Sequence, residues 1–432
     1  MEDLNEVVYM KVGFYTLGCK VNSYESEFAM SLFKEKEYEI CNFDDICDVY
    51  VINTCTVTNQ SDSKSRKIIN QAIRRNEKAC IVAMGCFIEA NKNQNFDGVD
   101  IAIGNKDKSK IVELVEEWLK KHQKINDLYD DLGYEFEDMY ITHYDGRTRA
   151  FVKIQDGCNN FCSYCIIPYV RGRCRSKDYD TVLKEIKALV ENDYKEIVLT
   201  GIHTGSYGRD IGRSFGELLK DILKIKGLYR LRISSIEITE LTDEVLDLLK
   251  NNNIIAEHLH VPLQAGSNDI LRLMNRKYDL DYYRKKIKEI RSIKPNISIS
   301  TDIIVGFPGE TEEMFLSTIE FAKEMKFSKI HVFPYSERKN TYAMKLPNHL
   351  ENALKKERAR KLIEVSKDLE IKYMKQFIGQ SVDVLIETND GINSYGHTSN
   401  YLHVLVPGKY NSEDIISVEI KDIKYPYVVG NN

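Results

Sequence analysis

Three cysteines stand close together near the middle of the chain, in the segment 156–165, which reads DGCNNFCSYC. We call Cys158, Cys162 and Cys165 the barrel trio, because they follow the first strand of a predicted β/α barrel over residues 147–374. Thiolates spaced C-x3-C-x2-C on one loop can bind three irons of a [4Fe–4S] cluster. No fourth cysteine follows at a ferredoxin-like offset, so one iron would keep an open position for a substrate. Zinc is the alternative, but it usually takes four protein ligands arranged in pairs, which this spacing does not provide.

Three further cysteines, Cys19, Cys55 and Cys86, each come just after a short apolar run in the first third of the chain. We call them the N-terminal trio. Ligands commonly bind at the carboxyl ends of parallel strands, so these thiolates would meet at one sheet edge. Free cysteines are also often ordinary core residues. The equivalent placement of all three favours a second cluster. We interpret the remaining four cysteines as structural: Cys41, Cys47, Cys80 and Cys174.

Composition limits the class of protein. A chain of 432 residues suggests two to four domains. With 61 basic and 66 acidic residues, a net charge of −5 excludes a protein that coats nucleic acid by bulk charge, but it allows local basic patches. No apolar run reaches the roughly 18–20 residues that span a bilayer, and residues 1–6 are acidic. We therefore expect a cytoplasmic protein without a membrane association, in which ten cysteines indicate metal ligation rather than disulfides.

The elements that must position the N-terminal trio alternate between strand-like and helix-like segments. Apolar β-branched runs predict buried parallel strands at residues 10–16, 49–53 and 80–84. Helical spacing predicts helices at residues 25–36, 62–76 and 106–120. This alternation indicates an open α/β domain over residues 10–122, followed by a polar linker at 121–146.

From residue 150 the alternation resumes for longer. Strand candidates lie at residues 150–155, 196–200, 229–234, 258–261, 297–304 and 329–333. Six β/α units predict a full or partial parallel barrel, (β/α)6, over residues 147–374, with its chemistry in the loops after the strands. A charged helix at 350–373 precedes short strands separated by turn residues. These strands predict a small antiparallel β-barrel over residues 376–432.

The C-x3-C-x2-C loop after the first barrel strand resembles that of radical S-adenosylmethionine (SAM) enzymes. The stretches TLGCKVN at 16–22 and NTCTVT at 53–58, with Gly85-Cys86, resemble the methylthiotransferases of that superfamily, and the C-terminal segment is similar to the TRAM RNA-binding module. The first two stretches, with KSR at 64–66, match the MtaB-type branch. Two departures are GCFIE at 85–89, without the usual small residue and glutamine, and Asn340 in place of a usual glycine.

This resemblance implies an enzyme that methylthiolates C2 of N6-threonylcarbamoyladenosine at tRNA position 37, next to the anticodon. It implies two [4Fe–4S] clusters and two SAM molecules. The barrel trio would hold the cluster that cleaves SAM to a 5′-deoxyadenosyl radical, and the N-terminal trio would hold the cluster that carries the sulfur. The implied partners are the tRNA anticodon stem-loop, an electron donor such as flavodoxin or ferredoxin, and a sulfur donor.

Other readings stay open at this point. The same chemistry could act on N6-isopentenyladenosine in tRNA or on a ribosomal protein, although those branches usually read GCQMN or GCPKN at the first motif. A different class is a non-catalytic iron–sulfur or zinc protein that binds RNA and senses redox state.

Further SAM contacts are expected on the loops that follow the barrel strands. The candidates are Gly201, Ser234, Glu237, Gln264 and Arg276. A glycine lets the backbone approach a ligand, and a guanidinium binds a carboxylate in bidentate fashion. Helix capping or solvation is an equal alternative for each residue taken singly.

Basic residues gather beside both trios and could contact phosphates. One group, 171–177, follows the barrel trio; a second, 64–75, follows Cys55; a third spans 272–291. Solvated helix faces are the alternative. In the C-terminal segment the aromatic candidates for RNA are Tyr395, Tyr401 and His403, which could equally be core residues.

Overall fold

The computed structural model describes residues 10–133, 135–144 and 146–431. The chain forms two compact units, and each is described by itself. The first unit comprises Met1–Ile141, Asp156–Asn159 and Cys165–Lys177. The second comprises Thr142–Gln155, Asn160–Tyr164 and Asp178–Asn432. Among the described residues, no helix combines the length and the apolar character needed to cross a membrane.

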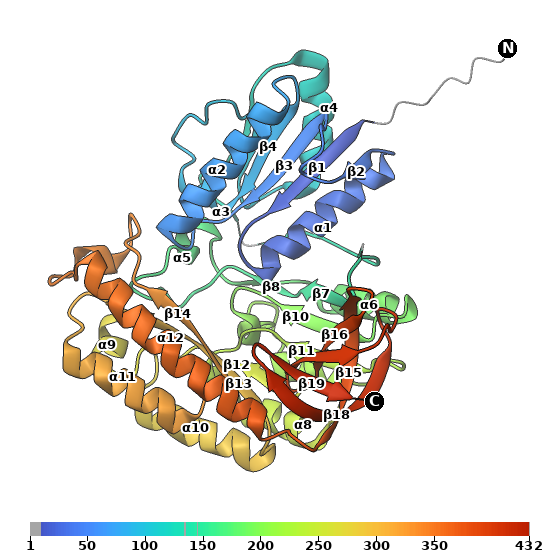
Figure 1. Ribbon diagram of the computed structural model, residues 1–432. Coiled ribbons are helices and arrows are strands. Elements are labelled where there is room, and N and C mark those ends of the chain that lie inside the picture. Colours follow the sequence, from blue (N-terminus) through green and yellow to red (C-terminus); the bar gives the residue numbers. More distant parts are fainter. Residues whose placement is uncertain (1–9, 134, 145, 432) are drawn as a thin grey trace. The chain divides into compact units, whose positions relative to one another are not determined.

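A six-stranded parallel sheet forms the centre of the first unit, in the order β2-β1-β3-β4-β5-β6 (Figure 1). The predicted strands are confirmed as β1 (Lys11–Thr16), β3 (Val49–Thr54) and β4 (Cys80–Gly85). Three strands of three residues were not predicted: β2 (Glu39–Cys41), β5 (Ile101–Ile103) and β6 (Ile125–Asp127). The strand β6 lies inside segment 121–146, where the sequence predicts a polar linker, so part of that segment extends the sheet.

Helices cover both faces of this sheet. They are α1 (Lys20–Glu35), α2 (Asn59–Arg75), α3 (Cys86–Ala90) and α4 (Ile111–Lys121). Alternate residues of β3 enter two separate cores: Tyr50 and Ile52 pack with α2 and α3, and Val49 and Val51 pack with α1 and α4. Burial on both faces explains why the parallel strands are continuous apolar runs. The open α/β domain predicted from the sequence is confirmed.

The second unit contains six parallel strands in two groups of three. They are β7 (Arg149–Lys153), β10 (Glu196–Thr200), β11 (Arg230–Ile233), β12 (His258–His260), β13 (Ser298–Val305) and β14 (Lys329–Pro334). Parallel bridges join β11 to β12 at Leu231–Ile255 and Ser235–His260, so the groups form one curved series. This is the partial (β/α)6 barrel that the sequence predicts.

Helices follow the barrel strands. They are α6 (Tyr179–Glu191), α7 (Phe215–Ile222), α8 (Asp243–Asn251), α9 (Asn268–Leu273), α10 (Leu280–Ile293) and α11 (Glu312–Met325). Short 3-10 helices occur at Lys108–Lys110, Thr204–Ser206, Ile238–Glu240 and Tyr342–Lys345. The segment 155–176 contains β8 (Gln155–Asp156), α5 (Ile167–Val170) and β9 (Arg175–Ser176).

The long helix α12 (Asn352–Lys375) packs along β14, where the Ser366 hydroxyl accepts the Ile330 N–H at 3.0 Å. Beyond it a closed five-stranded barrel is built from β15 (Ser381–Asn389), β16 (Asn393–Thr398), β17 (His403–Pro407), β18 (Ile415–Lys424) and β19 (Tyr427–Asn431). The small barrel predicted here is confirmed. One pair, β17 with β19, runs parallel, whereas the other pairs are antiparallel.

Candidate functional site

The N-terminal trio lies at the carboxyl ends of three neighbouring strands. Cys19 is the N-cap of α1, Cys55 follows β3 directly, and Cys86 is the first residue of α3. Gly18 has φ +100°, and a Cβ there would lie 3.0 Å from Cys55 Cβ and 3.1 Å from Cys55 Sγ. Only glycine therefore allows the turn after β1 to approach Cys55 this closely.

The thiols of Cys19, Cys55 and Cys86 lie near one another. Burial is the main cause that raises the pKa of Cys55, and the neighbouring thiols of Cys86 and Cys19 raise it further. Burial also raises the pKa of Cys19, while the Arg171 guanidinium lowers it. Cys55 and Cys86 are buried, whereas Cys19 keeps an exposed surface although protein atoms crowd its thiol. The convergence that strand ends predict is therefore present within the first unit.

Arg171 is the central side chain of this site. It is fully buried, with 0% of its surface exposed. Its Nε donates to Cys86 Sγ at 3.2 Å, and its Nη1 donates to Glu25 Oε1 at 2.9 Å and to Asp156 Oδ1 at 3.2 Å. Its Nη2 donates to Asn22 Oδ1 at 2.7 Å. Arg171 thus links one cysteine of the trio to two buried carboxylates, a role that sequence reasoning missed.

A second cation completes this buried network. Lys108 Nζ donates to Glu25 Oε2 at 2.7 Å and to Asn105 Oδ1 at 2.9 Å. Asn105 Nδ2 in turn donates to Cys86 Sγ at 3.5 Å and to the Val170 carbonyl at 2.7 Å. Because every charge here has an opposite charge beside it, the network satisfies the condition under which buried ions are tolerated.

The basic group at 171–177 was predicted to contact RNA, and burial contradicts this for three of its members. Arg171 is occupied as described. Arg175 pairs with Asp156 Oδ2 at 3.5 Å, and Lys177 Nζ donates to Tyr24 Oη at 3.3 Å; both side chains are buried. Arg173 is exposed. Charge alone does not distinguish a phosphate contact from a buried ion pair, which is why the prediction failed.

The barrel trio lies on the loop that follows β8. In the first unit, the Cys158 N–H donates to the Gly172 carbonyl at 3.1 Å. In the second unit, Arg276 Nη1 donates to Cys162 Sγ at 3.2 Å. A Cβ on Gly157 would lie 2.0 Å from the Arg173 carbonyl oxygen, and its φ is +69°, so the entry to this loop requires glycine.

Two of the predicted SAM contacts meet beside Cys162. Arg276 Nη2 forms an ion pair with Glu237, and its Nε donates to Tyr278 Oη at 3.2 Å. Tyr278 donates onward to the Leu263 carbonyl at 2.8 Å. These side chains line a small cavity with Asn160 and Thr239. Tyr278 carried no motif signal, although its place two residues after Arg276 could have suggested it.

The other three predicted SAM contacts lie at the expected strand ends and are not among the residues that line this cavity. Ser234 Oγ lies 3.4 Å from Thr204 Oγ1. A Cβ on Gly201 would lie 3.0 Å from Gln155 Oε1, so the glycine allows close packing there. Gln264 has φ +71° and its N–H donates to the Asp302 carbonyl at 2.9 Å. Their role in SAM binding stays a prediction.

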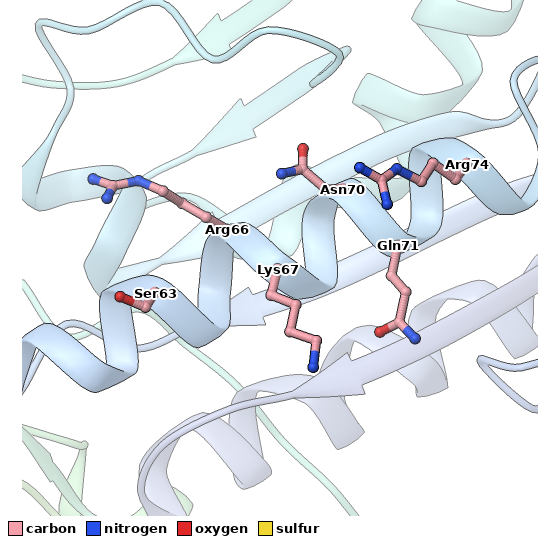
Figure 2. A pocket seen from close by; sticks show the side chains of 6 residues that line it. All are labelled: Ser63, Arg66, Lys67, Asn70, Gln71 and Arg74. Carbon is pink, nitrogen blue, oxygen red and sulfur yellow. The ribbon is translucent and has the colours of Figure 1, made fainter.

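Helix α2 presents an exposed basic face. A shallow pocket on its surface is lined by Ser63, Arg66, Lys67, Asn70, Gln71 and Arg74 (Figure 2). Arg75 differs, because its Nη2 pairs with Asp44 Oδ1 at 2.6 Å. The third basic group is partly neutralised, for example by the pairs Arg284–Glu324 at 2.6 Å and Lys286–Glu289 at 2.9 Å. The α2 face is therefore the better candidate for phosphate contacts.

Two of the three aromatic candidates in the C-terminal barrel, Tyr401 and His403, stack on other side chains of the second unit. The Tyr401 ring stacks on His258 at 4.6 Å and on His397 at 4.8 Å between ring centroids, and Arg232 lies over it at 4.5 Å. His403 stacks on His397 at 4.5 Å. Tyr401 therefore fixes the small barrel against β11 and β12, and the prediction that it is a stacking platform for RNA bases does not fit this position.

Comparison with known proteins places this geometry in context. Residues 152–322 match the Radical SAM superfamily, and residues 11–104 match the Uncharacterized protein family UPF0004. The chain is 42% identical to the threonylcarbamoyladenosine tRNA methylthiotransferase MtaB of Bacillus subtilis (strain 168), over 97% of this chain and 95% of that protein. It is 34% identical to a tRNA-2-methylthio-N(6)-dimethylallyladenosine synthase of Thermoanaerobacter sp. (strain X514), over 86% and 81% of the two chains.

Among solved structures, the radical SAM methyltransferase TsrM from Kitasatospora setae, crystallised with tryptophan and a SAM analogue, has a TM-score of 0.57. It shares 13% identity with this chain and covers 78% of it, and the match spans 75% of TsrM. At this identity the likeness establishes a shared fold. It agrees with the partial barrel described above.

Proposed function

The chain belongs to the threonylcarbamoyladenosine tRNA methylthiotransferase family of radical SAM enzymes, and from this membership we propose that it methylthiolates C2 of N6-threonylcarbamoyladenosine at position 37 of tRNA. The observation that carries the proposal beyond the family match is the N-terminal trio. Three cysteines, separated by more than 30 residues from one another in sequence, converge at one sheet edge beside a buried arginine. A radical SAM barrel alone does not require such a site.

We propose that each trio binds one [4Fe–4S] cluster. The residues of the N-terminal trio fit such a group, because three thiols lie together without a disulfide and are three of the four ligands a cluster takes. The raised pKa values of Cys19 and Cys55 are those of thiols without metal, and iron binding would replace the protons. When bound, SAM and the two clusters supply the radical and sulfur-transfer chemistry of this superfamily.

The protein's contribution at the N-terminal trio is orientation and charge. The Nε–H of Arg171 fixes the position of Cys86 Sγ, and its remaining nitrogens are held by Glu25, Asp156 and Asn22. A hydrogen bond to a ligating sulfur is one of the means by which a protein tunes a cluster. Cys19 is the exposed member of the trio.

At the barrel trio, we propose that Arg276 holds Cys162 and that Glu237 holds Arg276. All three nitrogens of this guanidinium already have partners in Cys162, Glu237 and Tyr278. When SAM is bound, Arg276 would hold its carboxylate in place of Glu237, and Glu237 would accept from its amino group. We retain Gly201, Ser234 and Gln264 as further SAM contacts.

We propose tRNA as the substrate partner, with the anticodon stem-loop presenting the nucleoside and the α2 face contacting phosphates. Arg66, Lys67 and Arg74 are exposed cations on one helix, at spacings that can follow a nucleic-acid backbone. A reductant such as flavodoxin or ferredoxin and a sulfur donor complete the partners that the reaction needs. The cytoplasm is the compartment in which these partners meet.

The substrate is tested by profiling the modified nucleosides of tRNA from a strain that lacks this gene. We expect 2-methylthio-N6-threonylcarbamoyladenosine to disappear and to return with the wild-type gene but not with Cys55→Ala. Loss of the 2-methylthio-isopentenyl nucleoside instead would favour the alternative branch, which the 34% identical relatives represent. An unchanged tRNA profile, together with loss of a modification on a ribosomal protein, would favour the ribosomal-protein branch.

The number of clusters is tested by anaerobic reconstitution. About eight irons per chain, with reductive cleavage of SAM, are expected for two [4Fe–4S] clusters. About four irons would contradict the second cluster. Bound zinc without 5′-deoxyadenosine would support the rival reading of a redox-sensing RNA-binding protein.

A further inference from the structure

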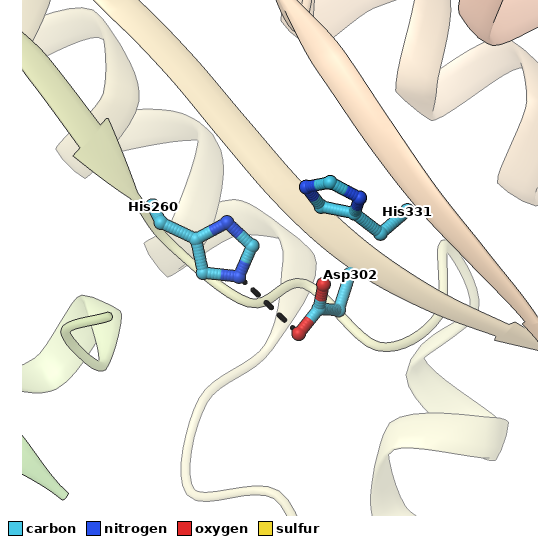
Figure 3. Close-up of side chains that lie close together, drawn as sticks. All are labelled: His260, Asp302 and His331. Atoms are coloured by element: carbon cyan, nitrogen blue, oxygen red, sulfur yellow. Dashed lines mark ion pairs between the residues drawn. The ribbon is translucent and has the colours of Figure 1, made fainter. Parts of the chain in front are cut away.

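Three metal-ligating side chains meet on the strands β12, β13 and β14, apart from both trios: His260, Asp302 and His331 (Figure 3). In the parallel register His260 is paired with Ser300, and Asp302 is paired with His331. Paired residues of neighbouring strands point to the same side, and so do residues two apart on one strand. The register therefore brings these three side chains onto one face of the sheet.

The distances are those of a potential ligand set. One ligand atom from each residue lies within 4.8 Å of the other two. His260 Nε2 lies 3.2 Å from Asp302 Oδ2, and the two imidazole rings are 5.6 Å apart between centroids. Two ligands on a tetrahedral Zn²⁺ are separated by about 3.4 Å, given metal–ligand distances near 2.1 Å. Asp302 and His331 are not buried, so small side-chain rotations close the difference.

A hydrogen bond to Ser300 fixes the orientation of the His260 ring. Its Nδ1 lies 3.0 Å from Ser300 Oγ, and that hydroxyl also lies 3.0 Å from His258 Nε2. A hydrogen bond to one ring nitrogen directs the other nitrogen towards a metal, which is the usual arrangement around ligating histidines. Ser300 thus aims His260 Nε2 at the space between Asp302 and His331.

We propose that His260, Asp302 and His331 bind a divalent first-row cation of the Zn²⁺ class. Two imidazoles and one carboxylate suit such a borderline ion and leave positions open for water. No cysteine contributes, so the site is chemically distinct from the two trios. A simple ion pair between protonated His260 and Asp302 accounts for two of the residues but not for the third, His331, on the adjacent strand.

The test is Zn²⁺ titration of the full-length protein with its iron–sulfur clusters loaded, by anaerobic calorimetry and by metal analysis after gel filtration. We expect one Zn²⁺ per chain in addition to iron. Affinity should fall at least about 10-fold in His331→Ala and in Asp302→Asn. Unchanged iron content in each variant shows that the fold and the clusters are retained.

His349→Ala is the matched control, because His349 Nδ1 lies 3.3 Å from Glu337 Oε1 in a histidine–carboxylate pair that belongs to no three-residue ligand group among the described residues. Its removal should leave Zn²⁺ affinity unchanged. Zinc X-ray absorption then identifies the ligands, since Zn–S bonds of about 2.3 Å differ from Zn–N and Zn–O bonds of about 2.0–2.1 Å. Absence of binding, equal affinity in His331→Ala, or sulfur ligands would each overturn the proposal.

Discussion

Two arginines each donate to a cysteine thiol at 3.2 Å, Arg171 to Cys86 and Arg276 to Cys162, but their surroundings differ. Arg171 has no exposed surface, and its other partners are two carboxylates and an asparagine that are all buried. Arg276 borders a small cavity, and its carboxylate partner, Glu237, has a partly exposed side chain.

The difference indicates that the two arginine–cysteine contacts differ in how easily the guanidinium can move. A guanidinium whose every nitrogen is held by buried groups can shift only if several hydrogen bonds break together. A guanidinium beside a cavity can exchange one partner for a ligand at lower cost. The rigid surroundings of Arg171 suit the sulfur-carrying cluster proposed for the N-terminal trio, and the cavity beside Arg276 suits the SAM site proposed for the barrel trio.

The largest expected effect separates the two trios by activity. Cys158→Ala should abolish both SAM cleavage and methylthiolation, because the cluster proposed at the barrel trio would lose a ligand. Cys55→Ala should abolish methylthiolation while leaving much of the SAM cleavage, since the barrel trio is intact. 5′-Deoxyadenosine and the methylthiolated nucleoside are measured in the same reaction by mass spectrometry.

Cys174→Ala is the control for these variants, because Cys174 lies near the barrel motif in sequence but is interpreted as structural. It should retain both products. Product formation by Cys55→Ala at the wild-type level would show that the N-terminal trio is not required, and the comparison between the two trios would lose its basis.

The next effect concerns stability. Arg171→Ala leaves Glu25 and Asp156 buried with fewer compensating charges, and breaking such an internal network typically costs about 3–5 kcal/mol. The free energy of unfolding, measured by denaturant titration of the apoprotein, should fall by this amount. Arg173→Ala removes an exposed arginine from the same segment and should change it by less than about 0.5 kcal/mol. A decrease of less than about 1 kcal/mol in Arg171→Ala would contradict the inference that its buried partners hold Arg171 rigidly.

The sequence predicts where the N-terminal trio lies, but it does not predict the contacts of Arg171. The N-terminal trio is predictable because each cysteine follows a strand whose apolar run is long enough to identify, and the ends of parallel strands meet by topology. The contacts of Arg171 are not predictable in this way. Its partners Glu25 and Asn22 lie almost 150 residues earlier, and nothing in the local sequence of residues 171–177 separates buried from exposed cations.

The same limit explains the fold-level differences. The strands β2, β5 and β6 have three residues each, which is too short for a periodic pattern to stand out from a loop. They are specified by pairing with neighbours already in place. The metal-type cluster of His260, Asp302 and His331 likewise depends on register between three strands, which the order of residues along the chain does not reveal.

A smaller effect is expected at the second arginine. Arg276→Ala should lower the free energy of unfolding by about 1–2 kcal/mol, less than Arg171→Ala, because water entering the cavity can solvate Glu237. It should raise the KM for SAM in the cleavage assay more than it lowers kcat, if exchange of Glu237 for SAM is its main role. Arg272→Ala, whose side chain is 76% exposed, is the control and should change neither quantity. A decrease in the free energy of unfolding equal to that of Arg171→Ala would show that the surroundings of the two arginines are equally rigid.

The smallest effect is expected on the α2 face, where the cations are exposed. Replacing Arg66, Lys67 and Arg74 by alanine should weaken tRNA binding and reduce the slope of log K against log [salt] by about 0.7–0.9 for each phosphate that is no longer neutralised. Unfolding free energy and SAM cleavage should stay unchanged, because these side chains lie at the surface. Arg75→Ala tests the distinction within the same helix: its guanidinium pairs with Asp44, so its removal should leave the salt slope as it is. If Arg75→Ala changed the slope as much as the replacement of Arg66, Lys67 and Arg74, then Arg75 would contact RNA despite its ion pair with Asp44.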